Sequence, residues 1–390
     1  MYYKGYKIRL YPTKEQEQMI LKHIGAYRYI WNYMLQKEIE QRDNDGFKFL
    51  QRSDLLKILS DLKKKDDYYW LNEVSTVSLQ HACFELIESY QYFFKHQKGH
   101  PKFKSKKNLK QSYQVRNDRT YFSDKGVKIE KVGFVKYKTD FDLPKGFGVK
   151  IFNVRLYVKN NKYMLSFSME CENQAPELND LVVGIDLGIK ELAVCAFEDK
   201  SIVFHNINKS QKIRDLYSKA KYYQKSLSRK QNAFKIRNEQ FFKTQNYIKA
   251  LNKLRKAHER IRNIRHNYIH QTTASIISLN PKIISMETLS VQDMLKTKNK
   301  TLRRLLGQQC FHEFLFQMKY KCMWHGIEFV QVPQLFPSSK ICSCCGNIKK
   351  DLSLSTRKYV CSECGFISDR DYNAAINLMK YGIQHKEFRL

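Results

Sequence analysis

Four cysteines near the C-terminus are spaced as ligands for a metal ion. They form two CxxC pairs with fifteen residues between the pairs: Cys342 and Cys345, then Cys361 and Cys364. Two such pairs can place four thiolates around one Zn²⁺ ion, and four protein ligands leave no open position for catalysis. Cys344 offers a second register for the first pair, although the symmetric spacing favours Cys345. The pattern therefore predicts structural zinc.

Two acidic residues stand inside apolar runs that read as buried strands. Asp186 lies in LVVGIDLGIKELAVCAF and Glu287 lies in KIISMETLSV. A buried carboxylate costs several kcal/mol unless a positive charge meets it. Asp186 could instead pair with a lysine or end its strand, because Gly184 and Gly188 flank it. Two lone carboxylates on two separate strands favour a metal site at the edge of a sheet.

A third carboxylate follows the cysteines at the start of a predicted helix, SDRDYNAAINLMKYG. Ser368 is expected at the N-cap, and a capping box between Ser368 and Asp371 is the structural alternative. Asp369 is about 200° around the helix from Asp371, so the two cannot face one ion. Asp371 shares a face with the small Ala375 and is the third candidate ligand. Such a triad fits an RNase H-like site that hydrolyses phosphodiesters with two Mg²⁺ ions, Mn²⁺ being an alternative.

The charge balance predicts a polyanionic partner. Lys and Arg outnumber Asp and Glu by 32, with an isoelectric point of about 9.6, and the surplus is spread along the chain. It is dense in KHQKGHPKFKSKKNLK, residues 95–110, where lysines surround an aromatic residue. A solvated loop is the alternative to phosphate contact there. The candidate nucleic-acid contacts are Lys98, Lys102, Phe103, Lys104, Lys106 and Lys107.

The remaining patterns describe the elements that must position these residues. A strand in 3–11 precedes a helix that begins at a Thr13–Gln16 capping box, and helical patterns continue to about residue 97. Period-two alternation from 112 to 172 predicts an antiparallel barrel or sheet with a turn at KNNK. A helical pair in 208–278 follows.

The sequence shows no membrane span or signal peptide, and the single cysteines elsewhere in the chain favour a reducing cytosol.

The motifs RLYPTKEQ, GHPKFKSK, GIDLGIKELAV, METLSV, FPSSKICSCCG, YVCSECGF and DRDYNAAINL resemble, in the same order, those of the TnpB family of insertion-sequence proteins. The resemblance implies an α+β multidomain fold, with an antiparallel wedge barrel and a helical recognition lobe before an RNase H-like (RuvC) α/β domain with an inserted zinc ribbon. The implied boundaries are wedge strand 1–12, recognition domain 13–107, wedge barrel 108–178, RuvC 179–336, zinc ribbon 337–366, RuvC 367–382 and a tail 383–390.

The same resemblance implies a function. TnpB proteins are RNA-guided DNA endonucleases, so the expected partners are a transposon-derived guide RNA and target double-stranded DNA with a short flanking motif. The triad would be catalytic, and a monomer with one RNA in the bacterial cytosol or nucleoid is expected. A non-cutting RNA-guided regulator and a strand-joining transposase are the alternatives, and intact carboxylates at all three positions argue against the regulator.

Overall fold

The computed structural model describes residues 2–45, 49–108, 110–146, 148–171, 176–349, 351–352 and 356–387. Its backbone contacts divide the chain into two compact units, Met1–Glu172 and Asn173–Leu390. Part of the predicted linker, 172–175, and the end of the predicted tail, 388–390, lie outside the described residues. Within the described residues, no helix combines the length and the apolar character needed to cross a membrane.

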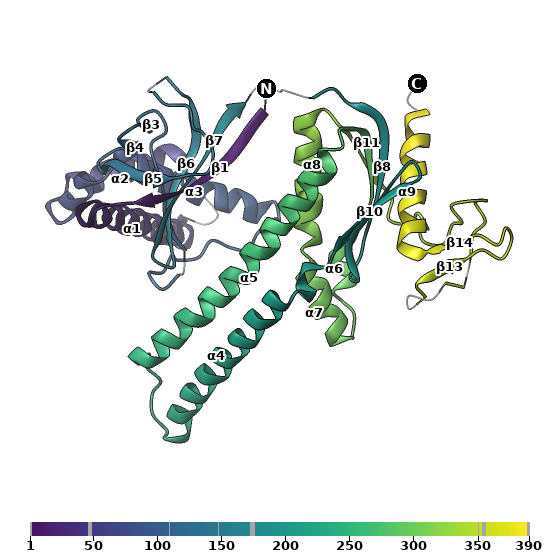
Figure 1. Cartoon of the computed structure of the whole chain (residues 1–390). Helices are drawn as coiled ribbons and strands as arrows, with labels where there is room; N and C mark the ends of the chain where they lie inside the picture. The colour runs from purple at the N-terminus through teal and green to yellow at the C-terminus, as the bar shows by residue number, and fades with distance from the viewer. Residues whose placement is uncertain are drawn as a thin grey trace. The chain divides into compact units, whose positions relative to one another are not determined.

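The first unit is built on a seven-stranded sheet in the order β2-β6-β7-β1-β5-β4-β3 (Figure 1). The strands are β1 (Tyr2–Tyr11), β2 (Lys110–Gln114), β3 (Tyr121–Ser123), β4 (Gly126–Ile129), β5 (Gly133–Lys138), β6 (Ile151–Lys159) and β7 (Lys162–Cys171). The N-terminal strand β1 lies inside the sheet, antiparallel to both β5 and β7. The predicted turn between β6 and β7 is confirmed, because Asn160 and Asn161 both have the positive φ that a tight two-residue hairpin requires.

Helices α1 (Lys14–Asp45), α2 (Arg52–Lys64) and α3 (Thr76–Phe94), with the short helix η1 (Asp66–Glu73), share one hydrophobic core with this sheet. The predicted capping box is confirmed at the start of α1. The backbone N–H of Gln16 donates to Thr13 Oγ1 at 3.3 Å, and the backbone N–H of Thr13 donates to Gln16 Oε1 at 3.0 Å. Two orphan donors of the first turn are thereby satisfied.

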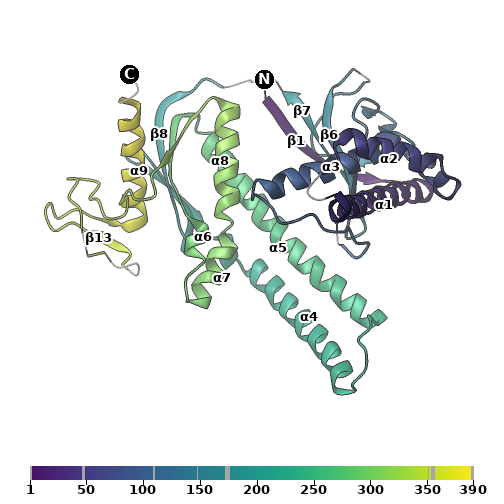
Figure 2. The same cartoon turned by 180° about the vertical axis from the view of Figure 1, so that it is seen from behind.

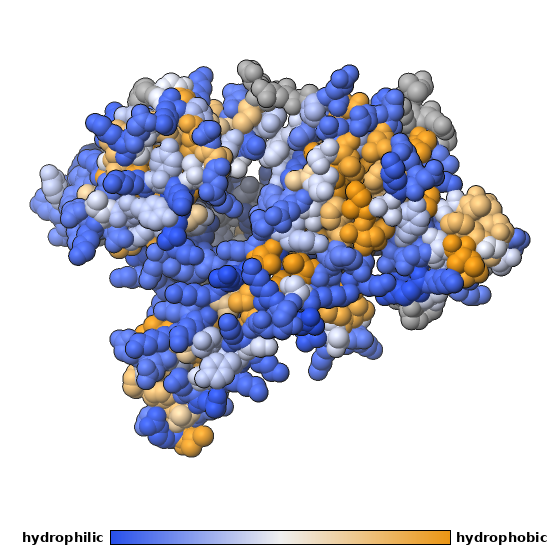
Figure 3. Space-filling model, viewed as in Figure 1, coloured by the Kyte–Doolittle hydropathy of each residue, from blue (hydrophilic) through white to orange (hydrophobic). Residues whose placement is uncertain are grey.

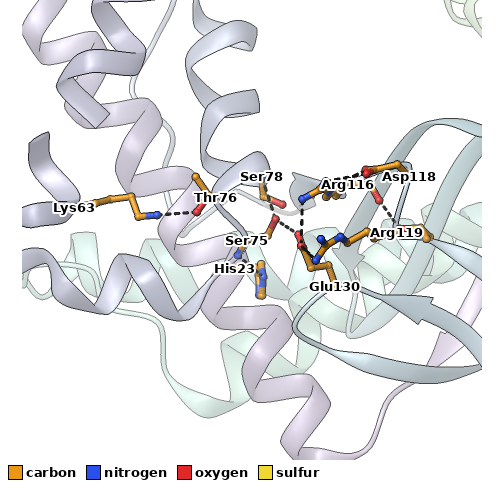
Figure 4. Close-up of polar contacts among 10 residues, drawn as sticks. His23, Lys63, Ser75, Thr76, Ser78, Arg116, Asp118, Arg119 and Glu130 are labelled. Carbon is orange, nitrogen blue, oxygen red and sulfur yellow. Dashed lines mark hydrogen bonds and ion pairs between the residues drawn. The ribbon is translucent and has the colours of Figure 1, made fainter. Parts of the chain in front are cut away.

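His23 joins α1 to the start of α3 as a buried neutral imidazole (Figure 4). Its Nδ1–H donates to the Met19 carbonyl at 2.9 Å, and its Nε2 accepts from the backbone N–H of Ser75 at 3.1 Å. The Ser75 hydroxyl also bonds the carboxylate of Glu130, which lies 3.7 Å from Arg116 Nη1. Burial lowers the pKa of His23 below its usual value, because a protonated ring would be desolvated and would lose its acceptor nitrogen.

Acidification is expected to destabilise the protein through His23. Since its folded pKa is depressed, the unfolded chain takes up the proton first, near pH 6.5. The stabilising contribution is complete above that pH and is lost as pH falls through the folded pKa. Between pH 7 and pH 5, the free energy of unfolding of the parent should therefore fall more steeply than that of His23→Gln, by up to about 1.4 kcal/mol per pH unit. Urea unfolding at several pH values measures this slope.

His258→Gln is the control, because His258 is exposed, and its stability should change with pH as that of the parent does. Parallel curves of stability against pH for His23→Gln and the parent would contradict the role assigned to His23.

The second unit is built on a five-stranded mixed sheet in the order β10-β9-β8-β11-β12. The strands are β8 (Asn179–Leu187), β9 (Glu191–Phe197), β10 (Lys200–His205), β11 (Pro281–Glu287) and β12 (Glu328–Val332). Strand β9 runs antiparallel to both β8 and β10, and β11 runs parallel to both β8 and β12. The α+β prediction is confirmed, while the closed barrel, the RNase H-like arrangement and the domain boundaries stay predictions.

Helices cover both faces of this sheet (Figures 1 and 2). They are η2 (Ile207–Lys209), α4 (Gln211–Ile236), α5 (Gln245–Ile277), α6 (Val291–Met294), α7 (Lys300–Gln309), α8 (Phe311–His325) and α9 (Arg370–Glu387), and the short strands β13 (Lys358–Val360) and β14 (Ile367–Asp369) precede α9. One hydrophobic core contains residues of α5, α8, β8 and β11. Helix α9 packs on the opposite face. The predicted helical pair is confirmed as α4 and α5, and hydrophilic residues cover most of this hairpin in Figure 3.

Side chains of β8 alternate between the two faces. Ile185 and Leu187 belong to the core with α5 and α8, so Gly184 and Asp186 point toward α9. The backbone of α9 comes so close to Gly184 that an added Cβ would overlap the carbonyl oxygen of Ala375 and the backbone nitrogen of Met379. The glycine beside Asp186 therefore allows α9 to reach the sheet.

Gly184→Ala is expected to lower the free energy of unfolding by about 3 kcal/mol, the upper end of the cost of overpacking a core. The clash is with helix backbone, which cannot move aside as a flexible side chain can. Thermal melting of the purified protein measures the loss. Gly307→Ala is the matched control, since Gly307 is exposed on α7 with open space around its Cα, and alanine there should be neutral or slightly stabilising. Equal melting temperatures for the two variants would contradict the packing argument.

Candidate active site and zinc centre

The sheet brings the first two predicted carboxylates together. In the parallel pair β8–β11, Ile185 is opposite Met286, so the next residues along the two strands, Asp186 and Glu287, end neighbouring strands side by side. Met286 belongs to the core with α5 and α8. By alternation, Glu287 lies toward the α9 face, as Asp186 does.

Helix α9 carries the third carboxylate, Asp371, and begins one residue later than predicted. Asp369 Oδ1 accepts from the backbone N–H of Asp371 at 2.9 Å and of Tyr372 at 3.3 Å. Asp369 is therefore the N-cap, and the predicted N-cap at Ser368 and its capping box with Asp371 are wrong. The physical reason is that β14 stays paired through Asp369, which is opposite Lys358, so the helix begins only at Arg370 and Asp369 is the residue before it. Asp371 lies in the first turn, only 8% exposed.

The three carboxylates influence one another electrostatically. Burial, then the charges of Glu287 and Asp371, raise the pKa of Asp186 well above its usual value, and the nearby Arg370 partly offsets this. Burial also raises the pKa of Glu287. Arg370 Nε lies 3.5 Å from Asp371 Oδ1, and Arg357 Nη1 lies 3.9 Å from the same oxygen. A buried group of like charges is costly by itself, and a cation would relieve the repulsion.

The carboxylate oxygens are more widely spread than the ligand atoms of a single-ion site. Their ligand atoms do not all lie within 4.8 Å of one another, whereas those of the four cysteines do. In two-metal sites the ions stand about 3.5–4 Å apart. The donor set consists of oxygens only, which suits Mg²⁺. The oxygen donors of Asp186, Glu287 and Asp371 therefore suit a hard divalent cation, and the number of ions stays a prediction.

The cysteine cluster has the dimensions of a zinc site. The two closest sulfur pairs, Cys342–Cys364 and Cys345–Cys361, are each separated by 3.6 Å. A tetrahedron with Zn–S bonds of about 2.3 Å has edges of about 3.8 Å, while a disulfide needs about 2.05 Å. Cys344 is exposed and lies outside the cluster. The four sulfurs that lie together are those of the register that uses Cys345, and their role as zinc ligands stays a prediction.

Two asparagines that the sequence analysis missed attach the cysteine segment to α9. Asn373 Oδ1 accepts from the backbone N–H of Ser343 at 2.9 Å, and Asn373 Nδ2 donates to the Ile341 carbonyl at 2.7 Å. Asn377 Nδ2 donates to the carbonyls of Ser338 and Ile341 at 2.8 and 2.7 Å. Both asparagines are buried. The available signal was their spacing of four residues on the apolar face of a helix, where an unpaired amide would be costly.

The predicted nucleic-acid residues lie between α3 and β2, in the first unit. Five are exposed: Lys98, Lys102, Phe103, Lys106 and Lys107. Lys104 is different, because its Nζ lies 2.7 Å from Glu85 Oε2 and 3.7 Å from the centre of the Trp31 ring. Lys104 is thus a half-buried residue that holds this segment against α1 and α3, while the predicted nucleic-acid contacts of all six residues stay predictions.

Family models match three successive parts of the chain. The helix-turn-helix domain of the OrfB family of IS605 matches residues 1–46, the OrfB model described as "Probable transposase" matches 166–298, and the "Cas12f1-like, TNB domain" matches 311–378. Each of these three parts of the chain is thus similar to a domain of OrfB-type or Cas12f1-like proteins.

Individual proteins and solved structures are also similar to this chain. Two relatives, one from Streptomyces pristinaespiralis and one from Escherichia coli K12, are each named a "Putative RNA-guided DNA endonuclease". Each is 27% identical to this chain, and the alignments cover 97% of this chain and 89% and 92% of the two relatives, respectively. A Cas12f1–sgRNA–target DNA complex has a TM-score of 0.34 at 16% identity, covering 97% of this chain and 99% of that one. The chain is therefore similar, over nearly its whole length, to proteins named as RNA-guided DNA endonucleases.

Proposed function

We propose that this chain is an RNA-guided DNA endonuclease of a transposable element, which cleaves double-stranded DNA next to a short flanking motif. The observation that carries the proposal is the meeting of Asp186, Glu287 and Asp371 at the ends of β8, β11 and the start of α9. In this group Asp371 is buried and Asp186 and Glu287 are half-buried, and the chain around them carries 32 excess positive charges. The basic surface attracts the polyanion, and the acidic centre, once it binds cations, hydrolyses it.

The triad would hold two Mg²⁺ ions, with Mn²⁺ as a substitute. Bound there, the ions supply a Lewis acid for the phosphate and an activated water for its hydrolysis. The chain's own contribution is positioning. Strand pairing fixes the separation of Asp186 and Glu287, and the Asp369 cap fixes the start of the helix that carries Asp371. Arg370 and Arg357, near Asp371 Oδ1, orient that carboxylate.

Structural Zn²⁺ in the cysteine cluster would hold α9 in place. The four cysteines leave no open ligand position, and the segment they fold is joined to α9 through Asn373 and Asn377. In this proposal, 337–366 is the zinc ribbon, and 179–336 with 367–382 form the RuvC domain.

The first unit would bind the nucleic acids. The five exposed residues of the 95–110 segment include four cations and one aromatic side chain, which suits phosphate contact and base stacking. Helices in 13–107 would form the recognition domain, and 1–12 with 108–178 would form the wedge. A monomer with one transposon-derived RNA, acting in the bacterial cytosol or nucleoid, completes the proposal.

The test begins with the RNA. The protein is expressed together with its native downstream DNA, purified at moderate salt, and the RNA that accompanies it is sequenced. A discrete RNA with a constant scaffold and a variable 3′ segment is expected, and it supplies the guide for cleavage of a plasmid that carries the matching target. Heterogeneous RNA without guided cleavage would contradict the proposal. Guided binding without cutting would identify a regulator, and joined strands among the products would identify a transposase.

A further inference from the structure

We propose that this protein has another metal site, separate from the cysteine cluster and from the three carboxylates. Its ligands are His266 and His270 of α5 and Glu313 of α8, and the ion is Zn²⁺. The proposal is independent of the guided cleavage described above.

The ligand atoms of these three residues are already gathered. All lie within 4.8 Å of one another. His266 Nε2 and Glu313 Oε1 are 3.3 Å apart, the separation of about 3.3 Å expected for two ligands on a tetrahedral ion with bonds of about 2.0 Å. His266 and His270 are one helical turn apart on α5, with ring centres separated by 4.7 Å. This spacing lets both imidazoles face a single point beside α8.

Buried side chains behind the site orient the carboxylate. Gln317 Nε2 donates to Glu313 Oε1 at 2.8 Å. At the other end of that amide, Gln317 Oε1 lies 3.0 Å from Thr273 Oγ1, whose one proton is shared between this oxygen and the Ile269 carbonyl at 2.9 Å. Lys321 Nζ in turn donates to Thr273 Oγ1 at 2.6 Å and to the His270 carbonyl at 3.0 Å. Metal sites use second-layer hydrogen bonds of this kind to hold their ligands. Gln317 and Thr273 are fully buried, so the support is part of the helix–helix core.

The donor set selects the ion. Two imidazoles and one carboxylate are typical ligands of zinc, whereas Mg²⁺ prefers oxygens alone. His266 is exposed and the other two ligands are half-buried, so an ion can enter from solvent and keep water in the fourth position. Bound Zn²⁺ would clamp the 33-residue helix α5 to α8 near its C-terminal half. The competing explanation is an ordinary ion pair between protonated His266 and Glu313.

Zinc stoichiometry separates these explanations. The full-length protein is dialysed to equilibrium against micromolar Zn²⁺ with millimolar Mg²⁺, which occupies the oxygen-only site, and bound zinc is measured by elemental analysis. Two zinc ions per chain are expected for the parent and one for His266→Ala. His258→Ala, which removes an exposed histidine from the same helix, should keep two. Cys361→Ser should keep the zinc at His266.

Glu313→Gln is a second variant that preserves side-chain shape, so that the proposal stays testable if an alanine variant folds poorly. It should also bind one zinc, with an unchanged melting temperature in chelator. One zinc per chain in the parent, or two in both ligand variants, would overturn the proposal in favour of the ion pair.

Discussion

Asp186→Asn should abolish guided cleavage while leaving binding of the RNA and of the target intact. The amide keeps the size of the side chain but removes the charge that two ions would share. Metal ions supply several kcal/mol of transition-state stabilisation, so a loss of about 4 kcal/mol corresponds to a rate reduced about 1000-fold. Single-turnover plasmid cleavage measures the rate, and a gel-shift titration measures target affinity.

Asp180→Asn is the matched control, because Asp180 lies on the same strand, where its carboxylate forms an exposed ion pair with Lys282. It should cleave as the parent does. A second readout follows from the repulsion around Asp186: in chelator, Asp186→Asn should melt at a higher temperature than the parent, since it removes a buried like charge. Unimpaired cleavage by Asp186→Asn would show that the triad is not the catalytic site.

Cys361→Ser should lose the zinc of the cysteine cluster and nearly all cleavage together. Structural zinc sites contribute about 10–16 kcal/mol to the folding of small domains, so the segment around the cluster should not fold without its ion. The start of α9 would then lose the contact between Asn373 and Ser343. Because loss of the groups that orient a metal ligand commonly reduces activity about 10- to 100-fold, we expect at least that reduction. Elemental analysis and the same plasmid assay provide the measurements.

Cys344→Ser tests the ligand register within the same four residues. Cys344 is exposed and outside the cluster, so this variant should retain both zinc and activity. The opposite pattern, in which Cys344→Ser loses zinc and Cys345→Ser keeps it, would require the other register. Full cleavage by zinc-free Cys361→Ser would remove the supporting role assigned to the ribbon.

Much of the candidate site follows from the sequence because it depends on local spacing. Two CxxC pairs specify a sulfur tetrahedron almost without regard to the rest of the fold. Acids inside apolar runs, such as Asp186 and Glu287, stand out against their strands in the same way. The capping box at Thr13 is likewise a contact between residues three apart. The family resemblance, which rested on several such motifs in order, agrees with the family models that match three parts of the chain.

The features that the sequence did not predict depend on contacts between segments far apart in the chain. Ser368 is as good a cap as Asp369 in isolation, and only the pairing of β14 with β13, which extends to Asp369, places the helix start at Arg370. Lys104 looks like its neighbours in sequence, but Glu85 and Trp31 draw it inward. Asn373 and Asn377 find their partners on a loop thirty or more residues away. Local patterns cannot reveal partners that only the folded sheet and helices bring near.

The hydrogen bonds of Asn373 and Asn377 in α9 determine which substitutions the cysteine segment can accept. Asn373 and Asn377 bond backbone atoms of Ser338, Ile341 and Ser343, and none of their side chains. These hydrogen bonds therefore do not depend on which side chains stand at the three positions, although the buried Ser338 and Ser343 leave room only for small ones. The cysteine segment is therefore attached to α9 through its backbone shape and not through the identity of its side chains. A ribbon taken from a relative with the same CxxC spacing should dock on this α9 without further redesign.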